Sequence, residues 1–187
     1  MLTFTRTEIK ELIKARLAVS AIFAIAMTGL GYATILALPI MMIIAGIAFV
    51  LHELGHKYVA QKYKCYAEFK ANDQALVIGA LLSLTGIILL APGAVHIGGI
   101  ATRQQHGRIA LAGPLVNIIL ALISIGIMTT SQGILNTLAQ QSLTLNSYLA
   151  IFNLIPFNPF DGKAVIDWNK TVWVVSVAIA GILLAIS

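Results

Sequence analysis

Two histidines and a glutamate lie in the pattern His52-Glu53-Leu54-Gly55-His56, within a long apolar stretch. In a helix, residues four apart share one face, so both imidazoles could bind a single zinc ion. The glutamate between them could hold a water molecule that the metal makes acidic. Ionisable groups in a membrane span are costly and are functional by default. The pattern predicts a zinc-dependent hydrolytic site, and the alternative is a metal-free cluster that extends to the membrane interface.

Catalytic zinc usually has a third protein ligand, and Asp161 is the candidate. It follows the segment NLIPFNPF (residues 153–160) and precedes Gly162. Pro156 and Pro159 are expected to unwind the preceding helix, and Gly162 lets the chain turn away, which can aim the carboxylate back toward the helices. The alternative role for Asp161 is to cap a loop.

The composition indicates that these residues are positioned by membrane-spanning helices. Of the 187 residues, 59% are hydrophobic and 10% are charged, against about 25% charged in a typical soluble domain. Residues 17–51, 74–101 and 109–160 are nearly free of charge, and each run exceeds the roughly 20 residues that cross a bilayer as a helix. The single cysteine, Cys65, excludes an internal disulfide. The net charge of +5 is attributed to membrane topology, not to nucleic-acid binding.

We therefore predict one α-helical polytopic membrane domain over residues 1–187, with about five to six transmembrane helices. Gly31 and Pro39 are expected to mark the first break, and the polar residues 129–133 the turn of a later hairpin. The predicted spans lie near residues 16–36, 39–62, 108–129, 135–157 and 171–187. Residues 74–91 either span the membrane or re-enter it, and short β-strands near the active site are expected to accompany the helices.

The basic residues favour the re-entrant arrangement of residues 74–91. If that segment dips in and returns, all the basic clusters fall on one side, which the positive-inside rule makes cytoplasmic. The clusters are Arg6/Lys10/Lys14/Arg16, Lys57/Lys62/Lys64/Lys70, Arg103/Arg108 and Lys163/Lys170. This topology places the N-terminus in the cytoplasm and brings Asp161 to the same side as the histidines. The N-terminal residues do not have the pattern of a cleavable signal peptide.

Three ordered motifs resemble those of the site-2 protease family of intramembrane metalloproteases. They are HELGH at residues 52–56, AGPLVN at 112–117, and NLIP at 153–156 leading into PFDG at 159–162. The resemblance covers about residues 39–165. It implies one zinc per chain held by His52, His56 and Asp161, with Glu53 as the general base and Asn117 near the substrate. It further implies transmembrane protein substrates and a location in the prokaryotic cell membrane.

The chain also departs from the family pattern. Lys163 stands where members commonly have a second glycine after the Asp-Gly pair, and neither the PDZ nor the CBS domains of some members are expected within these 187 residues. Residues 66–70 and 93–101 are expected to act as strands to which an unwound substrate adds, and the alternative for both is a plain loop. The apolar segment 74–91 is longer than a simple strand connection. These departures concern substrate selection and regulation, not the chemistry.

Several roles stay open at this level. Asn117 either binds an oxyanion or the substrate backbone, or it joins two helices by hydrogen bonds. A further role for His96 as a ligand is less favoured than a structural one. Two other functions remain as alternatives, namely a non-catalytic protein that binds partner helices and a metal-handling transporter. The absence of inverted repeats argues against the transporter, and the oligomeric state is not determined by the sequence.

Overall fold

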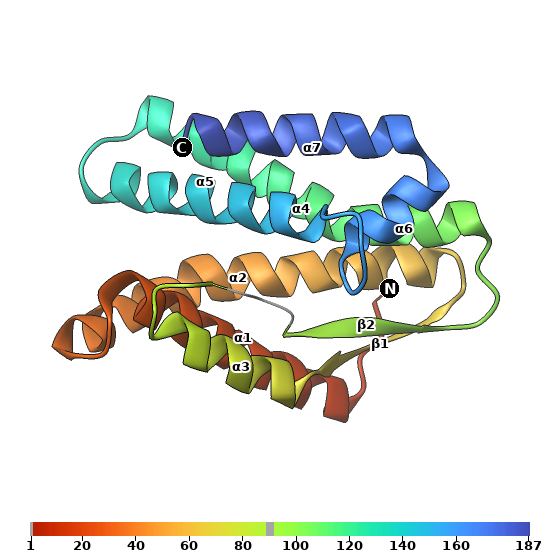
Figure 1. Cartoon of the computed structure of the whole chain (residues 1–187), viewed down its shortest axis with the longest axis horizontal. Helices are drawn as coiled ribbons and strands as arrows, with labels where there is room; N and C mark the ends of the chain where they lie inside the picture. Colours follow the sequence, from red (N-terminus) through yellow and green to blue (C-terminus); the bar gives the residue numbers. More distant parts are fainter. Residues whose placement is uncertain (1, 89–91) are drawn as a thin grey trace.

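The long helices lie side by side along the longest axis of the molecule, with a two-stranded sheet at one end (Figure 1). This computed structural model describes residues 2–88 and 92–187. Its helices are α1 (Arg6–Thr28), α2 (Tyr32–Lys62), α3 (Asp73–Ser83), α4 (Arg103–Thr130), α5 (Ile134–Asn153), α6 (Asp161–Trp168) and α7 (Lys170–Ala185). The strands are β1 (Tyr66–Ala71) and β2 (Gly93–Gly98), which pair antiparallel. The predominantly helical class expected from the sequence is confirmed.

The first break of the chain lies at residues 29–31, where Gly29 takes a φ of 71° that disfavours other residues. Helix α2 then runs without interruption from Tyr32, and Pro39 lies inside it. The sequence had suggested that Pro39 helps to end the helix. A proline removes one amide donor, and the surrounding turns of α2 hold the helix together across it.

The segment between the strands leaves the sheet and returns to the same place. Ala71, the last residue of β1, is paired with Gly93, the first residue of β2. Between them α3 has 11 residues, or about 16 Å of helix, which is shorter than the roughly 30 Å hydrocarbon core. The residues that flank the segment predicted at 74–91 therefore lie next to each other, which favours the re-entrant arrangement, and residues 89–91 lie outside the described part of the chain.

After the sheet come two long helices joined by a short turn, and a short helix follows them. Helices α4 and α5 are joined by residues 131–133, where Gly133 has a φ of 63°. Helix α5 ends at Asn153, and the proline-containing turn leads into α6. The sequence did not predict α6, because its 8 residues carry too short a pattern to separate from a loop.

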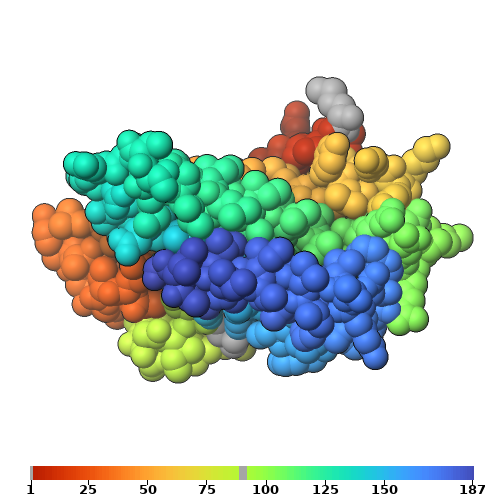
Figure 2. Space-filling model, turned by 90° about the horizontal axis from the view of Figure 1, so that it is seen from above, coloured from red at the N-terminus to blue at the C-terminus, as the bar shows by residue number. Residues whose placement is uncertain are grey.

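The surface carries large apolar side chains along the outer faces of the helices. Helices α2 and α4 are each long and apolar enough to cross a membrane, with mean hydropathy of 2.6 and 2.3 over their most apolar windows. Helix α7 runs along one face (Figure 2) and exposes Val174, Val175, Ile179 and Ile182. A soluble monomer rarely exposes contiguous apolar surface of this kind. The number of spans, five or six, stays a prediction.

Helices α2 and α4 approach each other closely at a glycine. A Cβ placed on Gly55 would lie 2.9 Å from the carbonyl oxygen of Ala112 and 3.0 Å from Val116 Cγ2. Small residues allow such contact between helices in membranes. Because Gly55 lies between His52 and His56, this contact sets the distance from the HELGH turn to α4.

A buried ion pair joins α1, α2 and β1 next to the HELGH turn. Lys57 Nζ lies 2.7 Å from both carboxylate oxygens of Glu8, and it also donates to the carbonyl oxygen of Ala67 at 2.7 Å. Glu8 accepts a further bond from the backbone N–H of Phe69 at 3.0 Å. Glu8 and Lys57 are 1% and 2% exposed. The pair therefore fixes β1 against the helix that carries the histidines.

The ends of α2 and α5 and the starts of α1, α4 and α7 lie at the same end of the molecule as the sheet (Figure 1). Most of the basic residues belong to these ends. Arg108 of α4 donates to the Tyr63 hydroxyl at 3.3 Å, and its guanidinium lies 5.7 Å from the centre of the Trp168 ring of α6. One end of the bundle is therefore basic, as the positive-inside interpretation requires.

Candidate metal centre

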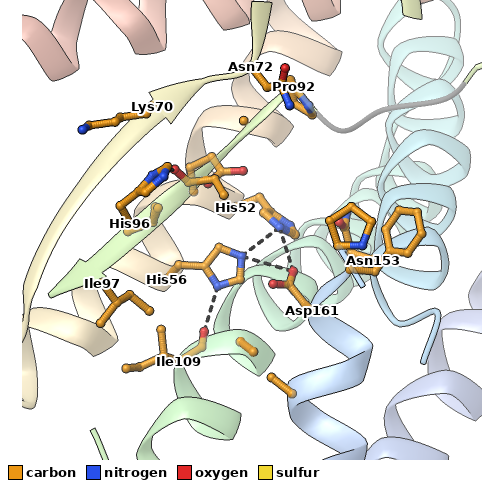
Figure 3. A pocket seen from close by; sticks show the side chains of 18 of the residues that line it. His52, His56, Lys70, Asn72, Pro92, His96, Ile97, Ile109, Asn153 and Asp161 are labelled. Atoms are coloured by element: carbon orange, nitrogen blue, oxygen red, sulfur yellow. Dashed lines mark hydrogen bonds and ion pairs between the residues drawn. The ribbon is translucent and has the colours of Figure 1, made fainter. Parts of the chain in front are cut away.

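Three side chains from two separate parts of the chain meet near the basic end (Figure 3). His52 Nε2 and His56 Nε2 of α2 lie 3.0 Å apart. Asp161 Oδ2, at the start of α6, lies 3.3 Å from the first nitrogen and 3.2 Å from the second. The three atoms form a nearly equilateral triangle of donors.

Both imidazoles are held with Nε2 free to coordinate. His56 Nδ1 lies 2.8 Å from the backbone carbonyl oxygen of Ile109, and His52 Nδ1 lies 2.6 Å from Asn117 Oδ1. An oxygen of either kind can only accept, so each Nδ1 carries a proton, and in the neutral imidazole Nε2 then keeps its lone pair. Metal-binding histidines are oriented in this way by a second hydrogen bond.

The donor set fits a zinc ion. Tetrahedral zinc with bonds of about 2.0–2.1 Å separates its ligand atoms by about 3.3 Å, close to the distances between His52, His56 and Asp161. Two lone pairs and a carboxylate oxygen facing one another would repel without a cation between them. Two histidines and a carboxylate also leave a fourth position, as in hydrolytic zinc sites.

A glycine of α4 leaves the room that these donors need. A Cβ placed on Gly113 would come within 2.5 Å of both His52 Nε2 and His56 Cε1. Any other residue at this position would displace the imidazoles. The glycine of the AGPLVN motif thus has a steric explanation that its sequence alone did not reveal.

The turn after α5 directs Asp161 toward the histidines. Gly162 packs against the end of α5, and a Cβ there would lie 2.6 Å from the carbonyl oxygen of Ile155 and closer still to Leu154. Trp173 of α7 donates from Nε1 to the Leu154 carbonyl oxygen at 2.7 Å. These contacts hold the start of α6 beside the HELGH turn.

Glu53 lies beside the donor triangle without belonging to it. The residue is 6% exposed, and its Oε2 has no hydrogen-bond partner in the described part of the chain. It lines the same cavity as the three donors, which has a volume of about 1380 Å³. A buried carboxylate oxygen without a partner is costly unless it meets water or substrate.

Asn117 is completely buried, and both of its polar atoms are engaged. Its Oδ1 faces His52, and its Nδ2 donates to Asn146 Oδ1 at 2.9 Å. The structure thus places Asn117 behind a donor histidine, and Asn146 behind Asn117. Asn146 was not predicted from the sequence, because α5 also contains Asn136, Asn153 and two glutamines, and nothing in that pattern distinguishes Asn146. His96 is exposed on β2 and lines the cavity.

Strand β2 lies between β1 and the donor triangle, with one edge facing the cavity (Figure 3). The N–H groups of Phe69 and Ala71 in β1 are taken by Glu8 and Glu11 of α1, at 3.0 and 3.2 Å. The backbone N–H groups of Phe69 and Ala71 therefore point away from β2. Because Val95 of β2 is paired with Phe69 and the direction alternates along a strand, the backbone N–H and C=O groups of Val95 and Ile97 point away from β1. Val95 and Ile97 have no backbone partner beyond the sheet in the described residues.

Comparison with known proteins agrees with the motifs and the site. The model of peptidase family M50 matches residues 40–143. A protein of Methanocaldococcus jannaschii, provisionally named a zinc metalloprotease, is 36% identical over 92% of this chain and 90% of its own length.

Two more distant relatives carry similar names. A second M. jannaschii protein, named a zinc metalloprotease, is 31% identical over 68% of this chain and 33% of its own length. A Bacillus subtilis protein, provisionally named a zinc metalloprotease, is 27% identical over 70% of this chain and 68% of its own length. No solved structure matches the chain significantly. Asp161 lies beyond the range matched by the family model, so its place in the site comes from the geometry.

Proposed function

Because the chain belongs to peptidase family M50, the site-2 protease family, we propose that it is an intramembrane endopeptidase. The family and the named relatives make it a zinc metalloprotease of the membrane. Its substrates in this proposal are membrane proteins, cut in or near their transmembrane segments. The observation that carries the proposal is the convergence of His52, His56 and Asp161 with the unpartnered Glu53 in one cavity.

His52, His56 and Asp161 would hold one zinc ion, and Glu53 would act as general base. When bound, the ion supplies a Lewis acid that acidifies water and polarises the scissile carbonyl. Glu53 removes a proton from the attacking water and returns it to the leaving amine. Its unpartnered Oε2 supports this role, because a carboxylate already engaged by fixed donors would be a weaker base. Asn117 and the Ile109 carbonyl keep the two imidazoles oriented.

The substrate backbone would bind along β2. A transmembrane helix hides its carbonyls in hydrogen bonds, so the segment to be cut must first unwind. The edge formed by Val95 and Ile97 offers N–H and C=O groups that can pair with an extended chain. The outer edge of β1 is covered by Glu8 and Glu11. Of the two strands expected to receive substrate, β2 is therefore the one we propose.

The active site would open toward the cytoplasm of a prokaryotic cell. Three observations support this orientation. The basic residues gather at one end of the bundle, and Asp161 lies near that end. Residues 72–92, the segment between the two strands, begin and end at the same place in the sheet. Water can then reach the cavity from the aqueous side, while the apolar faces of the helices contact lipid.

The experiment is cleavage of a model membrane-spanning peptide by the purified protein in lipid nanodiscs. Mass spectrometry of the products locates the cut bond. Cleavage within or next to the apolar segment, abolished by 1,10-phenanthroline and restored by zinc, is the expected result. Absence of cleavage of any transmembrane substrate by zinc-loaded protein would favour the helix-binding or transport alternatives.

A further inference from the structure

The two donor histidines are oriented by acceptors of different kinds. His56 faces a backbone carbonyl oxygen, which has no alternative to accepting. His52 faces the side-chain amide of Asn117. An amide can turn about its last bond and present its NH₂ group instead of its oxygen. If it did, His52 Nδ1 would have to accept, its proton would move to Nε2, and the lone pair needed for zinc would be lost.

A second amide prevents this reversal. Asn117 Nδ2 donates to Asn146 Oδ1 at 2.9 Å, and Asn146 Nδ2 donates to the Ser142 backbone carbonyl at 2.9 Å. The Ser142 carbonyl can only accept, so Asn146 must turn its NH₂ group toward it. Asn146 Oδ1 then faces Asn117, which must present its own NH₂ group there. Asn117 Oδ1 is then left to accept from His52. The orientation of both amides thus follows from a single fixed acceptor, the backbone carbonyl oxygen of Ser142.

We infer that Asn146 on α5 is a positioning residue that sets the tautomer of the zinc ligand His52 through Asn117. This inference rests on the proposed zinc site. Asn117 and Asn146 are 0% and 2% exposed, so water does not compete for their amides. Ser142 Oγ strengthens the far end, since it lies 3.2 Å from Asn146 Nδ2 and 2.9 Å from Ser124 Oγ. We call this chain of hydrogen bonds, from His52 through Asn117 to Asn146, the relay. It connects α2, α4 and α5, and each member donates its proton to the next, away from His52.

The relay predicts a loss of zinc affinity when Asn146 is removed. In Asn146→Leu, Asn117 is free to turn, and zinc affinity should fall by about 10- to 100-fold, as is typical when a partner behind a ligand is lost. Affinity is measured by competition with a chromogenic chelator in detergent. Ser147→Ala is the matched control, because Ser147 is equally buried on α5 and its Oγ has no partner in the described residues.

A second background separates positioning from a merely structural role. A carboxylate in place of the Asn117 amide can only accept, so it accepts the proton of His52 Nδ1 in either orientation. In the Asn117→Asp background, Asn146→Leu should therefore leave zinc affinity unchanged or raise it. A structural role for Asn146 would instead produce the same loss in both backgrounds, and this result would overturn the inference.

A spectroscopic test needs no variant at position 146. The chain has 4 histidines, so ¹⁵N-histidine NMR of the zinc-free protein can resolve their tautomers, with His52→Ala as the assignment control. We expect His52 to carry a proton on Nδ1, and an unprotonated Nδ1, with the proton on Nε2 alone, would contradict the relay. Zinc binding by the wild type that does not depend on His52 and His56 would refute the proposed site itself. Unchanged affinity in Asn146→Leu, with an intact zinc site, would refute the relay alone.

Discussion

Asp161 lies more than 100 residues along the chain from His52 and His56, yet the donor atoms of the three residues lie within 4.8 Å of one another. Each is held by different means. The backbone of α4 orients His56, a pair of amides orients His52, and a proline-containing turn delivers Asp161. Gly113 keeps the space between them open. The two Nε2 lone pairs and the carboxylate oxygen would repel one another without a cation between them. Their convergence from separate supports therefore indicates a site built to bind a ligand.

The first prediction at this scale concerns zinc content. We expect about one zinc per chain, lost in the His52→Ala, His56→Ala double variant and weakened in Asp161→Ala, because the site would fall below the usual three protein ligands. Elemental analysis of the purified proteins measures it. His96→Ala is the control and should retain its zinc, since His96 lines the cavity but lies outside the donor group. Full zinc in the double variant would contradict the proposed ligands.

The donor residues could be predicted from the sequence, whereas their supports could not. The spacing of His52 and His56 has a meaning in any helix, and Asp161 stands in a turn marked by prolines and glycine. The role of Asn146 depends on which residues of α4 and α5 face each other, and no pattern within either helix gives that pairing. Gly113 likewise requires the distance between α2 and α4.

At the scale of elements, the Glu8–Lys57 pair holds α1, α2 and β1 together. Removing one partner leaves the other charge buried, which typically costs about 3–5 kcal/mol. We therefore expect Lys57→Met to lower the thermal unfolding temperature strongly. The Glu8→Gln, Lys57→Met double variant should recover part of the loss. Unfolding in detergent can be followed by tryptophan fluorescence, since Trp168 and Trp173 report on α6 and α7.

An exposed ion pair provides the comparison for this prediction. Lys14 contacts Glu11 and Asp73 at 2.9 and 2.7 Å, and its side chain is 42% exposed. Exposed pairs contribute little to stability, so Lys14→Met should change the unfolding temperature only slightly. Equal effects of Lys57→Met and Lys14→Met would show that the buried pair does not hold these elements together.

The free edge of β2 leads to a prediction about substrate binding. Ile97 directs its N–H away from β1, so Ile97→Pro removes one edge donor and leaves the pairing with β1 intact. We expect slower cleavage at unchanged zinc content. Ile97→Ala removes the same side chain but keeps the N–H, and should retain most of the activity. The same loss in both variants would place the effect in the side chain and not in the edge.

The element boundaries show where sequence patterns were insufficient. Residues 129–133 and the prolines after Asn153 were recognised as breaks because polar or proline residues interrupt apolar helices there. Pro39 was overinterpreted, since a single missing amide does not end a helix that its neighbours support. The pairing of β1 with β2 joins residues separated by a long apolar segment, and alternation over six residues only hinted at it.

At the scale of the whole molecule, the basic end and the apolar faces define an orientation in the bilayer. We predict that positions 103 and 163 face the same side as position 62. Single-cysteine labelling in a Cys65→Ser background, with an impermeant reagent in intact cells and in inverted vesicles, measures this. All three positions should react only from the cytoplasmic side. Labelling of position 103 only from the opposite side would mean that the 72–92 segment crosses the membrane.

The central claim is that this bundle places a general base beside a zinc site in order to hydrolyse peptide bonds. Glu53→Gln tests it most directly, because glutamine keeps the size and hydrogen bonding of the side chain but cannot accept the proton. Zinc content and cleavage of the membrane-spanning peptide are measured on the same samples. We expect full zinc and a rate about 10²- to 10⁴-fold below that of the wild type. A wild-type rate in zinc-loaded Glu53→Gln would contradict the account.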